Sequence, residues 1–156
     1  MRIYSFRDVT AIIDASHEVT GWAPGDDVIT AERNVESATS SIGANGDMCV
    51  SVSADLSGKV KFKLLKTSSS NRYLLNRQRT MEIGTTTFVP VNLVIKDVHR
   101  QDVVLGIAGY VTKVPNLAFG EKAKEQEWEL NFQKLMYDLG DMMGAGTPSM
   151  LVENLG

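Results

Sequence analysis

A strand that passes directly into a helix start, at residues 58–71, constrains the fold of this chain more than any other segment. Its apolar side chains, Val60, Phe62 and Leu64, alternate with lysines. Successive side chains of a strand point to opposite faces, so the alternation predicts a strand that is buried on one face only.

A helix should follow this strand without a long linker. Thr67 or one of the serines at 68–70 is expected to cap it, because hydroxyl oxygens accept from the free amides at a helix start. The helix is predicted over residues 71–81, and Gly84 should end it. The segment therefore predicts one helix that is anchored directly at a sheet.

The rest of the chain consists of short apolar or alternating runs separated by turn residues. Strands are expected at residues 9–13, 18–22, 28–35, 48–53, 88–97, 103–113 and 127–137. For the last of them a helix over residues 122–137 is the competing interpretation, because Glu, Lys and Gln favour helices. This pattern predicts a mainly β fold, an antiparallel β-sandwich or barrel with one flanking helix.

Two of these strands carry more detailed predictions. Gly106 and Gly109 should mark a bulge, a bend or a close backbone contact. On the last strand, one face is expected to carry Trp128, Leu130, Phe132, Lys134 and Met136.

The length of 156 residues is typical of one domain. We expect residues 1–139 to form the β domain and residues 140–156 to be a tail that docks on a partner or is disordered. The net charge of -3 and a pI of about 5.4 argue against a protein that binds nucleic acid by neutralising phosphates.

The sequence indicates neither export nor membrane insertion. The single cysteine, Cys49, excludes an intrachain disulfide and is expected to be a buried thiol. Residues 1–8 lack the apolar core of a signal peptide. The apolar stretch 103–111 is far shorter than the roughly 20 residues that span a bilayer. A cytosol-like compartment is therefore expected.

Signatures of catalysis are absent from the sequence. It has no phosphate-binding glycine loop, no dinucleotide fingerprint and no paired zinc-ligand spacing. Asp97, His99 and Asp102 are the nearest approach to a ligand cluster, but Arg100 would oppose a cation there. We therefore expect no enzyme activity, no catalytic residue, no metal and no cofactor.

The lysine row of Lys59, Lys61 and Lys63 has two interpretations. It is either a solvated face or edge that charge protects against aggregation, or a surface that faces a neighbouring subunit bearing Glu32 or Glu36.

A second candidate contact surface is apolar. Leu117 and Phe119 lie in a loop at residues 115–120, and loose apolar side chains on a soluble domain often mark contacts.

Five segments in a fixed order resemble the tail tube proteins of contractile-tailed bacteriophages. They are residues 4–13, 21–34, 44–47, 58–75 and 126–129. None is a catalytic signature, so the specificity lies in the ordered set, which covers most of the chain up to about residue 137.

The resemblance implies closed rings of six β-rich subunits that stack into an inner tail tube. Viral DNA would pass through the lumen during ejection without sequence-specific binding. The partners would be other copies of the chain, the tail sheath, and the baseplate and terminator proteins. The location would be the virion tail, after assembly in the host cytoplasm. Related tubes occur in pyocins and type VI secretion systems.

Other functions stay open at this point. The chain could be a tail terminator or a baseplate hub-type ring protein, a secretion tube, or a β-barrel that binds a small ligand. For the tube function, the polar segment 36–47 is predicted to supply a loop between subunits or rings. Its tip would be formed by Asn45, Gly46 and Asp47, because Asn-Gly is a strong signal for a two-residue turn.

Overall fold

The structure, a computed structural model, describes residues 3–84 and 88–140. These residues contain nine strands and one α-helix. The strands are β1 (Val9–Ile13), β2 (His17–Glu18), β3 (Ile29–Arg33), β4 (Ala38–Ile42), β5 (Met48–Val52), β6 (Gly58–Leu64), β7 (Val91–Asp97), β8 (Val103–Lys113) and β9 (Gln126–Asp138). A short 3-10 turn, η1 (Phe6–Asp8), precedes β1, and the helix is α1 (Ser70–Ile83).

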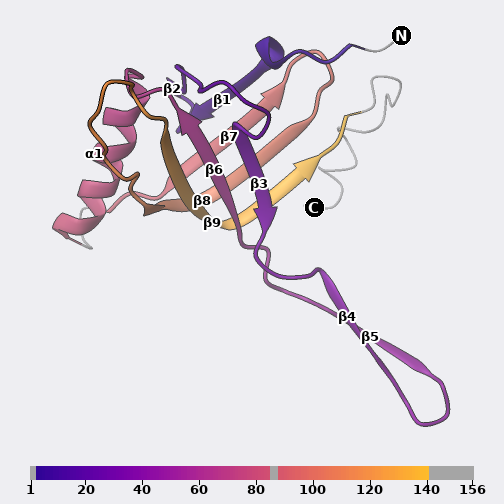
Figure 1. Ribbon diagram of the computed structural model, residues 1–156. Coiled ribbons are helices and arrows are strands. Elements are labelled where there is room, and N and C mark those ends of the chain that lie inside the picture. The colour runs from indigo at the N-terminus through magenta and orange to yellow at the C-terminus, as the bar shows by residue number, and fades with distance from the viewer. Residues whose placement is uncertain (1–2, 85–87, 141–156) are drawn as a thin grey trace.

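Seven strands form one antiparallel sheet in the order β2-β1-β7-β8-β9-β6-β3, and β4 and β5 pair separately. The sheet is strongly coiled, so that β3 and β6 cross the direction of β7 and β8 (Figure 1). The segment after β2 connects the two ends of the coiled sheet, because it forms hydrogen bonds with both β1 and β6. Val19 N donates to Ala11 O at 2.8 Å, and Ala23 N donates to Lys63 O at 3.0 Å. The predicted mainly antiparallel β fold with one flanking helix is confirmed.

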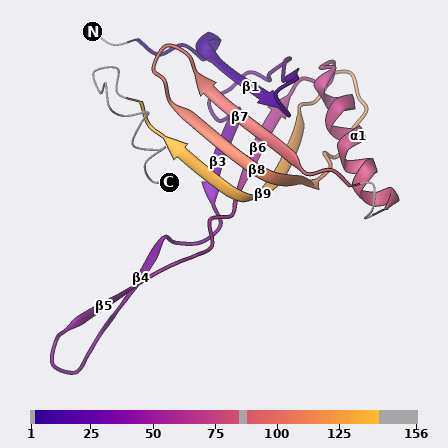
Figure 2. The same cartoon turned by 180° about the vertical axis from the view of Figure 1, so that it is seen from behind.

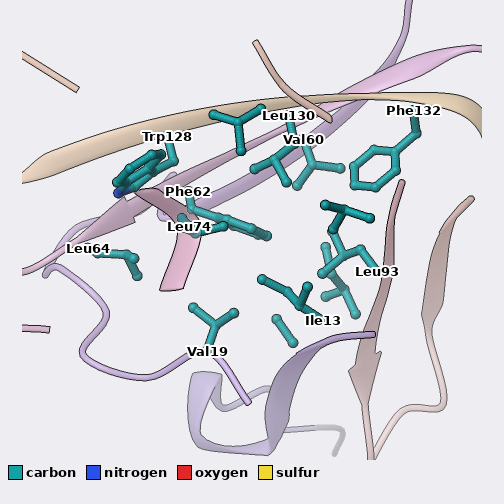
Figure 3. Packing of buried hydrophobic residues seen from close by; sticks show 14 of the residues in the cluster. Ile13, Val19, Val60, Phe62, Leu64, Leu74, Leu93, Trp128, Leu130 and Phe132 are labelled. Atoms are coloured by element: carbon teal, nitrogen blue, oxygen red, sulfur yellow. The ribbon is translucent and has the colours of Figure 1, made fainter. Parts of the chain in front are cut away.

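The core lies inside this coiled sheet (Figure 3). Val60, Phe62 and Leu64 on β6 are each 0% exposed, which confirms the predicted alternation. From β9, Trp128 and Phe132 pack against the same cluster. Large apolar side chains thus fill the interior and stabilise the sheet by burial.

Helix α1 confirms its prediction closely, since it starts one residue earlier and ends two residues later, at Gly84. One serine makes the expected bond, since Ser68 Oγ accepts from the N of Ser70, the first helical residue, at 3.2 Å. Ser69 is the N-cap residue, but its side chain makes no capping bond. Ser68 Oγ donates to Thr20 O, and Ser70 Oγ accepts from Thr20 N at 3.1 Å. The serine run therefore fastens the helix to the segment that bridges the sheet.

Residues 126–138 form strand β9, so the competing prediction of a helix is wrong. The prediction of which side chains share one face of this strand is also wrong at its end. Lys134 and Met136 are not buried, whereas Leu135 is 0% exposed. The pairing of β8 with β9 skips Ala108 and Gln133, and Ala108 has a positive φ of 55°. Beyond this irregular pairing, the alternation of buried and exposed residues along β9 is shifted by one position, so that Leu135 points into the core.

The glycines of β8 confirm the predicted close contact. The ring of Phe132 lies over both Gly106 and Gly109, and a Cβ on Gly106 would come within 2.8 Å of it. Asn92 supports the irregular backbone beside them, since its Oδ1 accepts from Ala108 N at 3.0 Å. Glycine is needed here because a bulky ring occupies the space of a side chain.

The prediction of a buried thiol is wrong, because Cys49 is exposed on β5. Strand β5 pairs with β4 in a hairpin outside the seven-stranded sheet, so neither of its faces lies against the core. The polar segment before it, in which no regular structure was expected, contains β4.

Candidate functional site: a projecting hairpin

The hairpin of β4 and β5 extends away from the body of the protein (Figure 2). Every residue of both strands is exposed. We call residues 34–57 the arm. An isolated two-stranded hairpin is at best marginally stable in water, so an arm of this kind gains stability from whatever it contacts.

The root of the arm is held by Asn34. Its Nδ2 donates to Ser57 Oγ and to Asn131 Oδ1, each at 3.0 Å, and its backbone N donates to Ser57 O at 3.1 Å. Ser57 also donates from its N to Asp55 Oδ1 at 2.9 Å. Hydrogen bonds from the Ser57 side chain and backbone lower the pKa of Asp55. The exit of the arm from the sheet is therefore fixed by specific polar contacts.

The tip of the arm is a loop over residues 43–47, wider than the predicted two-residue turn. Gly43 N donates to Asp47 O at 2.7 Å, and Gly46 N donates to Gly43 O at 2.9 Å. Gly46 has a φ of 89°, a conformation that suits glycine. Asn45, Gly46 and Asp47 are all exposed at this outer end.

The strand pairing gives the arm two chemically different faces. Opposed pairs share a face. On one face the pairs are Ala38 with Val52, Ser40 with Val50, and Ile42 with Met48. On the other they are Thr39 with Ser51, and Ser41 with Cys49.

The first of these faces is apolar and exposed to an unusual degree. Ile42 is 67% exposed, Met48 62%, Val50 56% and Val52 80%. We call these four residues the apolar arm face. Contiguous exposed apolar side chains of this kind mark an interaction surface.

The lysine row lies in a charged ladder within one subunit. Lys59 Nζ lies 3.3 Å from Glu32 Oε1 and 3.9 Å from Glu129 Oε1. Across β6 and β9, Lys61 is opposite Glu129 and Lys63 is opposite Glu127. Three lysines and three glutamates thus alternate on the outer face of β3, β6 and β9. Glutamates of the same subunit therefore balance part of the charge of the lysine row, and a neighbouring subunit is not needed for that part.

Leu117 and Phe119 lie elsewhere, in the loop between β8 and β9, and are 67% and 83% exposed. Lys66 holds this loop: its Nζ donates to Ala118 O at 3.0 Å and lies 4.1 Å from the centre of the Phe119 ring. Their exposure agrees with the sequence prediction, and their role as a contact surface stays a prediction.

The structure brings some of the predicted contact residues together and separates others. Glu32 pairs with Lys59, and Glu36 lies in the arm near its root. Leu117 lines a pocket together with residues of α1, and Phe119 lies against Lys66. Sequence reasoning missed the apolar arm face. The sequence signal for this face was the alternation of apolar and small polar residues at 48–52. It did not reveal the partner strand at residues 38–42, because that run is mostly small and polar.

Asp97, His99 and Asp102 form a turn and not a ligand cluster. Asp97 Oδ1 accepts from the backbone N of His99 and of Arg100, each at 3.1 Å. No group of three or more residues able to hold a metal is found among the described residues. Within the same residues, no helix is long and apolar enough to cross a membrane.

Comparisons with known proteins agree with this architecture. A chain from the virion of the native gene transfer agent particle is similar in fold, with a TM-score of 0.58 and 11% identity; the match covers 86% of this chain and 98% of that one. The anti-feeding prophage cap, a tube terminating cap, gives a TM-score of 0.58 and 7% identity over 90% of this chain and 93% of that one. No curated protein sequence matches.

The profile of the bacteriophage PhiTE tail tube protein family matches residues 1–140, which include the whole coiled sheet, the arm and α1. A match of this extent assigns the family. The chain belongs to the bacteriophage PhiTE tail tube protein family, and is a structural protein of a phage tail.

Proposed function

We propose that this chain is the repeating subunit of the inner tail tube and that the arm links successive subunits. The observation that carries this proposal is the apolar arm face, whose four side chains are between 56% and 80% exposed. Burying such a surface in a contact is favourable by about 25 cal/mol per Å². The surface most readily available in a polymer is a neighbouring copy.

The geometry of the arm favours head-to-tail assembly. One copy offers the arm, and the next copy must offer a different surface to receive it. Contacts of this heterologous kind generate rings where the rotation closes and helical stacks where it does not. Closed rings of six subunits that stack into a tube are the proposed result, in keeping with the family resemblance.

The proposed role in the tail is passive conduction of DNA. A subunit with a net charge of -3 suits a lumen that repels phosphate, so that a polyanion slides through it during ejection. The proposed partners are further copies of the chain, the tail sheath, and the baseplate and terminator proteins, with assembly in the host cytoplasm. No catalytic activity and no cofactor are proposed. The predicted tail at residues 140–156 lies, apart from Gly140, outside the described residues.

Negative-stain electron microscopy of the purified protein tests this function. The intact chain should form rings or tubes with a central hole, whereas a variant lacking residues 40–47 should stay soluble and folded without assembling. Circular dichroism should show that the variant keeps the signal of the seven-stranded sheet and loses only the part due to the shortened β4–β5 hairpin. Normal tubes from the deletion variant would refute the role of the arm.

A tail terminator is the second candidate, because the tube terminating cap of the anti-feeding prophage is as similar in fold as the gene transfer agent chain. A terminator should form one ring that does not grow. Concentrated protein that gives single rings at every concentration would favour this candidate, and long tubes would exclude it.

A further inference from the structure

A pocket of about 260 Å³ lies between α1, residues 114–117 and the start of β9. Arg72, Leu75, Asn76 and Arg79 line it from the helix. Their spacing of three, four and seven residues places them on one helical face. The pocket therefore presents two guanidinium groups with an apolar side chain between them.

The rest of the lining is mainly apolar. Val114, Pro115, Leu117 and Trp128 contribute carbon surface, Gln126 adds an amide, and Asn71 adds a second amide whose Oδ1 accepts from Trp128 Nε1 at 2.8 Å. Among the residues that the structure describes, no hydrogen bond or ion pair engages the side chain of Arg72, Arg79 or Gln126. These polar groups are available to a ligand.

Both walls of the pocket are held in place. Arg77, on the other side of α1, forms an ion pair with Asp14 at 2.9 Å. Opposite the helix, Lys66 pins the loop through Ala118 O. A partner would meet a largely formed surface, which reduces the entropy lost on binding.

The charge of the pocket contrasts with that of the whole chain, which is -3. Since Arg77 is neutralised by Asp14, Arg72 and Arg79 remain as a local positive pair on an acidic protein. Guanidinium groups bind carboxylates through two parallel hydrogen bonds, which makes such pairs selective.

The spacing of the two arginines defines the ligand further. Seven residues along a helix correspond to about 10 Å. In an extended peptide, two carboxylates four residues apart lie on the same face and are about 13 Å apart, a span that two long arginine side chains can meet. An apolar side chain between them would enter the carbon-lined part of the pocket.

We propose that this pocket docks an extended acidic segment of a different protein, with carboxylates on Arg72 and Arg79 and an apolar anchor beside Leu75. We infer an acidic ligand because its carboxylates would complement the charge of the two arginines. The apolar lining favours a peptide over nucleic acid. The site lies at the side of the molecule that carries α1, away from the arm (Figure 1). The inference therefore goes beyond the tube function and concerns a partner of each subunit.

Fluorescence anisotropy with a labelled extended peptide tests the proposal directly. The probe carries two glutamates four residues apart with a leucine midway between them, so that all three side chains share one face, and a second probe has glutamine in place of glutamate. We expect the first probe to bind the full chain, and the double variant Arg72→Glu, Arg79→Glu to bind it at least about tenfold more weakly. The matched control Arg7→Glu reverses an exposed arginine on η1, outside the pocket, and should bind like the unaltered chain.

Three results would overturn the proposal: no binding of the glutamate probe, equal binding of the glutamine probe, or equal binding by the double variant. Tighter binding of a DNA oligonucleotide that the double variant abolishes would assign the pocket to nucleic acid instead. Circular dichroism confirms that each variant is folded. Tube formation, followed by microscopy, reports on the proposed function separately, because the pocket does not include the arm.

Discussion

At the scale of single residues, the close approach of β8 to Phe132 depends on the lack of a side chain at Gly106 and Gly109. The ring occupies the place where either Cβ would lie. A core at native density cannot absorb an added methyl group without displacing its neighbours.

Gly109→Ala should therefore lower the free energy of unfolding by about 1–3 kcal/mol, because the new methyl group overlaps the Phe132 ring. Urea denaturation measures the change. Gly120→Ala is the control, since a Cβ there meets nothing within 4 Å, and its effect should stay within about 0.5 kcal/mol. Equal effects of the two substitutions would contradict this account of the packing.

Asp14 is a second residue on which several elements depend. Its Oδ2 lies 2.9 Å from Arg77 Nη2 and accepts from Tyr73 Oη at 3.2 Å, and its Oδ1 accepts from Asn92 N at 3.0 Å. Burial, and then the charge of Asp14, raises the pKa of Tyr73. The carboxylate thus connects the turn after β1 to α1 and β7.

Asp14→Asn should destabilise the fold by about 1–3 kcal/mol, because it leaves the mostly buried Arg77 without its counter-charge. It should also move the Tyr73 pKa back towards its ordinary value, which an ultraviolet titration detects. The sign is fixed: with Asp14 present, the neutral phenol is favoured in the folded state, and that contribution disappears as the pH rises through the raised pKa. Glu32→Gln, at a more exposed ion pair, should change stability by less than about 1 kcal/mol and leave Tyr73 unaffected.

At the scale of elements, segments buried on one face were predictable and the arm was not. Strand β6 and helix α1 have patterns that contact with the core imposes, so their positions follow from the sequence. In β9 the irregular pairing at Ala108 and Gln133 cannot be read from alternation, and it moved Leu135 to the buried side. The thiol of Cys49 was misplaced for another reason: apolar alternation predicts burial only where a core exists.

The two faces of the arm allow a matched test of its function. Val50→Asp should abolish tube formation while the subunit stays folded, because it places a charge in the proposed contact. Ser51→Asp adds the same charge on the opposite face and should reduce assembly much less. Sedimentation and negative-stain microscopy would measure both. Equal loss of assembly would show that the contact does not use the apolar arm face.

At the scale of the whole molecule, the coiled sheet, the helix and the family were within reach of the sequence, but the position of the contact surfaces was not. The charges of residues 59–63 are visible in the sequence. Their balance by Glu127 and Glu129 depends on the pairing of β6 with β9, which joins segments more than 60 residues apart. The pocket on α1 likewise needs the loop at residues 114–117 placed beside the helix.

Cys49 offers a probe of the assembled state because it is exposed on the arm. Because Cys49 lies on the face opposite the apolar arm face, a thiol-specific reagent should modify it at a similar rate in dispersed subunits and in tubes. The Val50→Asp protein should react rapidly at every concentration. Modification at least about tenfold slower in verified tubes would show that the contact also covers the polar face of the arm.

The arm continues the paired strands β3 and β6, and this continuity has a mechanical consequence (Figure 1). A force on the tip is directed along both strands, so it shears the seven opposed pairs between β6 and β9 together and does not unzip them singly. A chain of subunits joined in this way would carry tension from β6 into β9, and so into the interior of the sheet.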